Sequence, residues 1–147
     1  MTGEHSHWDW RDKAGSVGAG AQMLTAVWCE GQPQGLMAVK TFPEPSKIGA
    51  SGVLYVDYLE TAPWNLGASA RFAGIGTLLI AEAVFISLGR GLGGRVGLHS
   101  LPQAEPFYTN RCRMTSLGPD PGYYDLAYFE YTEQQAADFL SRIGMAP

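Results

Sequence analysis

The feature that most constrains this chain is a glycine-rich turn that opens directly into a strongly apolar segment. The turn spans residues 71–76 (RFAGIG), and the apolar residues from 77 to 88 fall on more than one helical face. This pattern predicts a buried helix from about Gly74 to Leu88, ended by Gly89 in a left-handed cap. A helix start offers backbone N–H groups without intrahelical partners, and the helix dipole adds positive charge there. The turn is therefore suited to bind a phosphate, and its glycines allow a close approach to the main chain.

Size and composition limit the classes to which the chain can belong. Its 147 residues predict one domain over 1–147 with one core. Apolar residues make up 46% and charged residues 16%, which excludes a disordered chain. A net charge of -4 argues against a nucleic-acid partner, since such proteins carry a basic stripe. No signal peptide or membrane-spanning stretch is visible, so we expect a cytoplasmic protein that does not bind membranes. The two cysteines and three histidines predict no metal site.

Turn residues and apolar patterns predict alternating strands and helices. A short helix over Pro102–Asn110 and a last helix, begun by a capping box at Thr132 and Gln135, follow the central helix. The segment 1–21 is polar and predicted to be loose. Turns are expected at 31–35, 43–51 and 118–122. The expected strands are Gln22–Glu30, Leu36–Phe42, Gly52–Glu60, Arg95–Ser100, Met114–Leu117 and Tyr124–Tyr131. This order predicts an α/β or α+β fold with helices packed on a sheet.

Two motifs in this order resemble a known family. The spacing Arg-x-x-Gly-x-Gly at 71–76 resembles the acetyl-CoA pyrophosphate loop of the GNAT family, the GCN5-related N-acetyltransferases. Ala104-Glu105-Pro106-Phe107-Tyr108 resembles the short helix whose tyrosine lies near the coenzyme sulfur in that family. The resemblance covers about residues 22–131. It implies a GNAT-like mixed, mostly antiparallel central sheet flanked by helices.

The same resemblance implies an activity and its ligands. It implies an acetyl-CoA-dependent N-acetyltransferase in which a primary amine attacks the thioester directly. Acetyl-CoA would be a co-substrate, no metal would take part, and the amine would belong to a small molecule or a protein. Pantetheine would pair with the main chain of Tyr58, Leu59 and Glu60. The pyrophosphate would be held by Arg71, Phe72, Ala73, Gly74, Ile75, Gly76 and Thr77.

Candidate catalytic residues follow from the needs of acetyl transfer. Tyr108 is the candidate general acid toward the leaving thiolate, because a phenol stays protonated at neutral pH. Glu60, at the end of the central strand, is the candidate general base, directly or through water. Asp57 is the alternative base, and strand alternation predicts it on the face opposite to Glu60. His99 lies on a strand near the expected pocket and is interpreted as a core histidine rather than a base. Cys112 is interpreted as a small buried residue rather than a nucleophile.

The sequence also departs from the family pattern. Only residues 1–21 precede the first strand, so the N-terminal cap is shortened, absent or supplied by another chain. A homodimer would cover the apolar surface that a shortened cap leaves. Leu101 stands where the family often has an asparagine that contacts pantetheine. These departures favour one alternative, a GNAT-shaped module that binds acyl-CoA or a protein without turnover. A dinucleotide-binding unit is disfavoured, because position 79 is leucine where its third glycine would stand.

Overall fold

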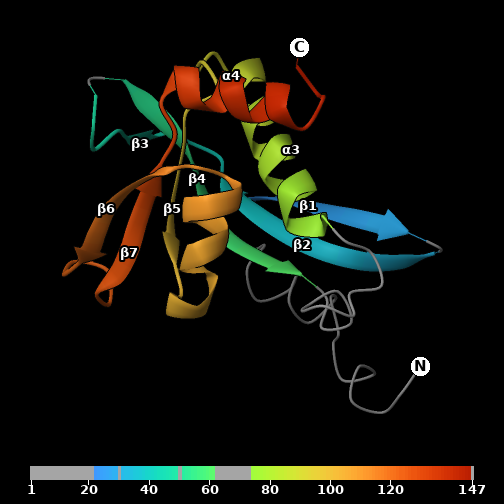
Figure 1. Ribbon diagram of the computed structural model, residues 1–147, viewed down its shortest axis with the longest axis horizontal. Helices are drawn as coiled ribbons and strands as arrows, with labels where there is room; N and C mark the ends of the chain where they lie inside the picture. The colour runs from blue at the N-terminus through green and yellow to red at the C-terminus, as the bar shows by residue number, and fades with distance from the viewer. Residues whose placement is uncertain (1–21, 30, 50, 62–73, 147) are drawn as a thin grey trace.

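The computed structural model describes residues 22–29, 31–49, 51–61 and 74–146, and its strands form one seven-stranded sheet (Figure 1). The strand order is β1-β2-β4-β5-β7-β6, with β3 paired to β4 off this path. The pair β4–β5 runs parallel, and the other neighbouring pairs of described strands run antiparallel. The bounds are β1 Gln22–Cys29, β2 Gln32–Lys40, β3 Glu44–Pro45, β4 Gly52–Thr61, β5 Val96–Ser100, β6 Thr115–Asp120 and β7 Leu126–Glu130.

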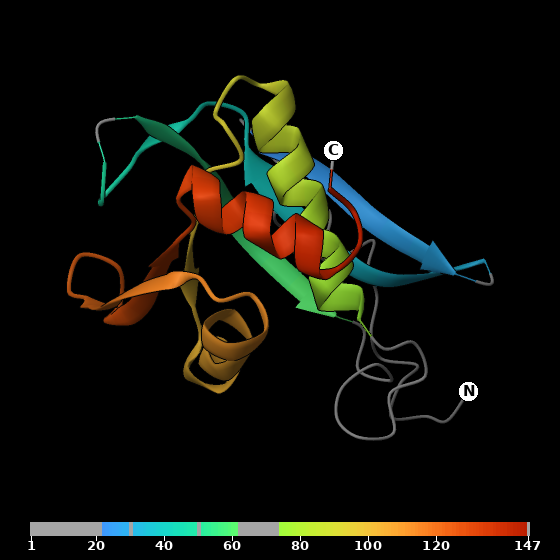
Figure 2. The same cartoon turned by 45° about the horizontal axis from the view of Figure 1, so that its top comes forward.

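The helices pack on one face of this sheet. They are α3 (Ile75–Gly89), α4 (Glu133–Arg142), the 3₁₀ turn η2 (Pro102–Ala104) and the single-turn π-helix η3 (Phe107–Arg111). Figure 2 shows α3 and α4 crossing in front of the same sheet face. Within the described part of the chain, no helix covers the opposite face, which we call the open face. The described helices therefore pack against one side of the sheet.

The core lies between α3 and the sheet. Side chains of α3, including Leu79, Ile80 and Val84, pack against β2, β4 and β5 and are at most 1% exposed. α4 adds Phe139 and Leu140 to the same cluster. Because strands and α4 enclose α3 from several directions, a helix that is apolar all round is stable here. The predicted buried helix and the apolar stripe of α4 are confirmed.

The predicted order of strands and helices is confirmed apart from β3, which lies in a predicted loop, and several local predictions are wrong. β2 begins at Gln32, so Gly35 lies within a strand; a Cβ there would lie 2.7 Å from Cγ2 of Ile75, so only glycine lets α3 pack this closely. Gly89 is the last residue of α3, and it is Gly91 that has a positive φ of 77°. β6 runs on to Asp120 instead of ending near Leu117.

Two more predictions concern the start of α4 and the N-terminal segment. The capping box is confirmed: the N–H of Gln135 donates to Oγ1 of Thr132 at 3.1 Å, and the N–H of Thr132 donates to Oε1 of Gln135 at 3.0 Å. The segment 1–21, predicted to be a loose or shortened cap, lies outside the described residues. Among the helices that are described, none has the length and apolar character needed to cross a membrane.

Candidate active site

The central strands β4 and β5 separate from each other toward their C-terminal ends. Their pairing covers three positions, from Leu54 opposite Val96 to Val56 opposite Leu98, whereas β4 runs on to Thr61. A cavity of about 270 Å³ lies at this separation, which we call the β4–β5 cleft. Its walls are residues 55–59 of β4, residues 98–101 of β5 and the turn after it, Ala104, Tyr108, Tyr123 and Leu126. A strand edge that leaves its neighbour can pair with the amide groups of an extended ligand.

A β-bulge at Asp57 marks the start of this separation. In the pairing with β2, Val39 is opposite Val56 but Ala38 is opposite Tyr58, so Asp57 is an extra residue. Bulges bend a strand and shift its side-chain alternation. Leu59 consequently packs on the core, as Val56 does, while Tyr58 and Glu60 fall on the open face.

The strand alternation from which Asp57 was predicted to lie opposite to Glu60 is interrupted by this bulge. The pKa of Lys40 is raised first by its hydrogen bond to Glu44 and then by nearby carboxylates, among them Asp57. Lys40 also lies over the ring of Tyr55, 5.1 Å from its centroid, on the open face. The Asp57 carboxylate is therefore near enough to Lys40 for its charge to act on it.

The start of α3 has the features that favour an anion. Gly74 is the N-cap residue, with φ of 82° and no side-chain capping bond, and the first turn carries no acidic residue. The first hydrogen bond of the helix runs from the N–H of Leu78 to the carbonyl of Gly74 at 2.9 Å. The amides of Ile75, Gly76 and Thr77 thus belong to the group that intrahelical bonds leave without acceptors. A Cβ on Gly74 would meet no atom of the described residues within 4 Å.

Tyr108 brings a buried phenol to the β4–β5 cleft. It lies on η3, is 6% exposed, and packs against Phe107 and Phe129 with ring centroids 5.1 and 5.6 Å apart. Burial, with a smaller contribution from Cys112, raises the pKa of Tyr108 above its ordinary value of 10. The phenol is therefore protonated at neutral pH and able to donate a proton or a hydrogen bond.

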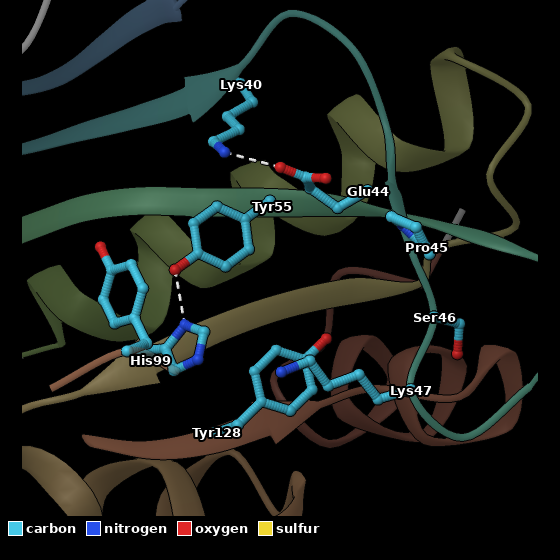
Figure 3. Close-up of a pocket in the computed structure, with 9 residues that line it drawn as sticks. Lys40, Glu44, Pro45, Ser46, Lys47, Tyr55, His99 and Tyr128 are labelled. Atoms are coloured by element: carbon cyan, nitrogen blue, oxygen red, sulfur yellow. Dashed lines mark hydrogen bonds and ion pairs between the residues drawn. The ribbon is translucent and has the colours of Figure 1, made fainter. Parts of the chain in front are cut away.

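A second cavity lies on the open face of the sheet, and we call it the open-face cavity. It also measures about 270 Å³, and its walls are Lys40, residues 44–47, Tyr55, His99, Tyr123 and Tyr128. In Figure 3 these side chains stand in front of the strands, and the helices lie behind. Tyr55, His99 and Tyr123 line both cavities, so these three rings form the wall between the open-face cavity and the β4–β5 cleft.

Hydrogen bonds tie this wall to β6 and to the loop after β3. The hydroxyl of Tyr55 lies 2.6 Å from Nδ1 of His99 (Figure 3), and Nε2 of His99 lies 2.7 Å from Oδ2 of Asp120. Nζ of Lys47 donates to the same Asp120 oxygen at 2.7 Å. The hydrogen bond from Lys47, followed by that of His99, holds the pKa of Asp120 well below its usual range. Burial and then the neighbouring Tyr123 raise the pKa of Tyr55.

The loop that carries Lys47 is itself anchored on a buried acid. Glu130 is 0% exposed and accepts from the N–H of Lys47 at 2.9 Å, from the Tyr128 hydroxyl at 2.7 Å, and from the Ser46 hydroxyl. Nζ of Lys47 lies over the Tyr128 ring, 4.3 Å from its centroid. These contacts fix one side of the open-face cavity to the sheet.

The protein is similar to known proteins in structure rather than in sequence. No family model matches the sequence, and no curated protein matches it. A bacterial toxin of known structure is 16% identical, with a TM-score of 0.62 over 100% of this chain and 91% of the toxin. A mutant of the toxin AtaT, bound to acetyl-CoA and the C-terminus of the antitoxin AtaR, is 14% identical (TM-score 0.58, 89% and 77% covered). The PaiA N-acetyltransferase from Thermoplasma acidophilum, in complex with coenzyme A, is 13% identical (TM-score 0.55, 82% and 65% covered).

The protein has the GNAT fold. The resemblance stated from residues 71–76 and 104–108 is therefore confirmed at the level of fold. The mixed, mostly antiparallel sheet with helices packed on it is confirmed as well. At these sequence identities the likeness establishes the arrangement of strands and helices, and the chemistry must be argued from the site.

The GNAT fold brings some of the predicted site residues together and leaves others apart. Tyr58 and Leu59 line the β4–β5 cleft together with Tyr108. Gly74, Ile75, Gly76 and Thr77 lie at the start of α3. Glu60 lies one residue beyond the part of β4 that lines the cleft. Arg71, Phe72 and Ala73 lie outside the described residues.

Sequence reasoning missed most of the wall between the cavities. Tyr55 and Asp120 were not singled out, and His99 was interpreted as a core histidine. The available signal was the alternation of aromatic and ionisable residues in two strands. Tyr55 and Asp57 alternate in β4, and Tyr128 and Glu130 alternate in β7. The partners of His99 lie 44 and 21 residues away in sequence, so local patterns do not reveal them. Among the described residues, no group of three or more His, Cys, Asp and Glu side chains is placed to hold a metal ion.

Proposed function

We propose that the protein is an acetyl-CoA-dependent N-acetyltransferase that transfers the acetyl group to a primary amine by direct attack. The observation that carries this proposal is the separation of β4 from β5, which leaves an edge of β4 in a cleft shared with Tyr108. The start of α3 is linked to this cleft through Phe107, which packs on Gly76 and precedes Tyr108. The similarity to a GNAT enzyme bound to coenzyme A and to a toxin bound to acetyl-CoA supports the choice of coenzyme.

Coenzyme binding would divide between two parts of the fold. The amides of Ile75, Gly76 and Thr77 would receive the diphosphate, because it carries the negative charge that a helix start attracts. Arg71, Phe72 and Ala73 complete the proposed loop. The main chain of Tyr58, Leu59 and Glu60 would pair with the amides of pantetheine along the free edge of β4. When bound, acetyl-CoA supplies an activated thioester at the end of the cleft.

Tyr108 would act as the general acid of the transfer. The amine nitrogen forms a bond to the carbonyl carbon, the carbon–sulfur bond breaks, and the sulfur takes a proton from Tyr108. The raised pKa of Tyr108 keeps that proton in place until the thiolate leaves. Its position in the wall of the cleft, among Phe107 and Phe129, fixes the direction of the hydroxyl.

The acceptor would reach the thioester from the open face, and it must lose a proton as it reacts. The open-face cavity has room for the side chain of a protein amine or for a small molecule. Glu60 remains the proposed base from the sequence, acting directly or through water, and Asp57 lies closer to the cleft. A primary amine carried by a small molecule or a protein fits both routes.

The proposed function is tested by measuring both acetyl-CoA binding and turnover with the full chain. Acetyl-CoA should raise the melting temperature, and free CoA thiol should accumulate when spermidine, glycine methyl ester or a lysine-containing peptide is added. Absence of stabilisation by acetyl-CoA would overturn the proposal. Stabilisation without thiol release from any of the amines would favour the alternative, a GNAT-shaped module that binds the coenzyme without turnover.

A further inference from the structure

The wall between the two cavities contains a continuous chain of hydrogen bonds that the proposed function does not use. It runs from the Tyr55 hydroxyl to Nδ1 of His99 over 2.6 Å, and from Nε2 of His99 to Oδ2 of Asp120 over 2.7 Å. Its first member faces both cavities, where a thioester and an amine would meet. Its last member lies on β6, at the outer edge of the sheet.

The direction of each hydrogen bond follows from the chemistry of the groups. An ionised carboxylate only accepts, so Nε2 of His99 must carry the hydrogen that points to Asp120. The ammonium of Lys47, bound to the same oxygen at 2.7 Å, keeps Asp120 ionised. In neutral histidine the other ring nitrogen then has a lone pair, and Tyr55 donates its hydroxyl hydrogen to it. The oxygen of Tyr55 has two lone pairs, so beside its hydrogen-bonded neighbour Tyr123 it can still accept a hydrogen from an incoming amine.

Packing holds the chain in this arrangement. The ring of Tyr123 stacks on His99 at 4.1 Å with an interplanar angle of 20°, and Tyr128 packs at 5.0 Å on the ring of His99. The His99 side chain is 7% exposed, and Tyr55 is also 7% exposed. The imidazole therefore cannot turn to another partner without breaking contacts with both rings, and the tautomer is fixed as in other buried histidine–carboxylate pairs.

We propose that Tyr55, His99 and Asp120 form a relay that removes the proton from the acceptor amine. This inference rests on the proposed function, and in it the relay takes the place of Glu60 or Asp57 as the general base. As the carbon–nitrogen bond forms, the amine N–H bond breaks and its proton passes to the oxygen of Tyr55. The hydroxyl proton of Tyr55 passes at the same time to Nδ1 of His99. Asp120 stabilises the resulting imidazolium, which returns its proton through Tyr55 to water after the amide leaves.

The position of the carboxylates favours this relay over the bases expected from the sequence. Glu60 is not among the residues that line either cavity, and Asp57 lines the β4–β5 cleft but not the open-face cavity. Tyr55 lines both cavities, so an amine that enters the open-face cavity would lie beside this side chain. Tyr55 is the catalytic residue in this scheme, and His99 and Asp120 are positioning residues that act through it.

The test compares matched hydroxyl deletions. Tyr55→Phe should lower kcat/KM for the amine that wild type acetylates best by roughly a hundredfold, the usual contribution of a general base, with unchanged affinity for acetyl-CoA. Tyr131→Phe is the control, because its buried hydroxyl donates to the carbonyl of Cys112 on the packed side of the sheet. His99→Ala should lose a similar factor and regain activity on addition of imidazole, whereas Tyr55→Phe should gain nothing from imidazole.

Three further outcomes decide the matter. Nitrogen-15 NMR of histidine-labelled protein should show His99 as the Nε2–H tautomer, assigned by the signal that His99→Gln removes. The opposite tautomer would overturn the relay whatever the activity. Full turnover by both Tyr55→Phe and His99→Ala would overturn the relay alone and leave the proposed function standing. A wild-type protein that acetylates no amine would instead overturn the proposed function, and the relay with it.

Discussion

The ring of Phe107 packs directly against Gly76: a Cβ on this glycine would lie 3.1 Å from Cζ of the ring. Gly76 belongs to the first turn of α3, and Phe107 precedes Tyr108 on η3. The contact therefore joins the proposed phosphate site to the segment that carries the proposed acid. A shift of either element must move the other.

This contact predicts an energetic coupling between the two residues. Gly76→Ala gains helix propensity but forces the Phe107 ring to move, whereas Phe107→Leu makes room for the new methyl group. We expect the double mutant to be about 1 kcal/mol more stable than the sum of the single changes predicts, as for side chains in contact. Urea unfolding of the four proteins measures this term. Additive effects would show that the two elements are not in contact in solution.

Substitutions at Gly74 distinguish backbone strain from a steric effect on ligand binding. Its φ of 82° lies in the left-handed region, where valine costs about 1–2 kcal/mol and asparagine costs less. Because a Cβ there meets no atom of the described residues within 4 Å, we expect any loss of coenzyme affinity to come from contact between the new side chain and the ligand. We expect Gly74→Asn and Gly74→Val both to weaken acetyl-CoA binding by about tenfold, or 1.4 kcal/mol. Calorimetry that finds wild-type affinity in Gly74→Asn would move the diphosphate away from this turn.

Tyr108→Phe tests the proposed acid. Removal of the hydroxyl should lower kcat by roughly a hundredfold and leave the affinity for acetyl-CoA unchanged, because a general acid acts mainly on the leaving group. Fixed-time assays of thiol release measure kcat, and calorimetry measures the affinity for acetyl-CoA. Tyr131→Phe again serves as the control. Equal kcat in Tyr108→Phe and wild type would remove Tyr108 from the chemistry.

The buried thiol of Cys112 should make the free energy of unfolding depend on pH in the alkaline range. Burial raises the pKa of this thiol from 9.0 to about 12 in the folded protein. Between these values the unfolded thiol loses its proton and the folded thiol keeps it, so the folded state binds more protons and stability falls as pH rises. The free energy of unfolding should drop by about 1 kcal/mol more between pH 9 and pH 10 in wild type than in Cys112→Ala. Parallel curves for the two proteins would contradict the raised pKa.

Much of the fold could be predicted because the responsible signals are local. The apolar run after Gly76 specifies a buried helix, and the Thr132–Gln135 pair specifies the start of α4. The bulge at Asp57 could not be predicted, because it depends on how β4 pairs with β2. Without the bulge, simple alternation placed Asp57 and Glu60 on opposite faces.

The candidate site was predictable only where one segment carries it. The glycine turn and Tyr108 were found because each belongs to a short motif. The partners of His99 come from β4 and β6, which the sheet order places on either side of β5 and β7. Asp120 was hidden further by its neighbours Gly118, Pro119, Pro121 and Gly122, whose turn-forming character dominates the local pattern.

A crystal structure of the full chain with acetyl-CoA tests the central proposal most directly. We predict the diphosphate on the amides of Ile75, Gly76 and Thr77, pantetheine along β4 beside Tyr58 and Leu59, and the sulfur within hydrogen-bond reach of Tyr108. A coenzyme bound elsewhere, or a start of α3 filled by a side chain of the protein itself, would contradict it.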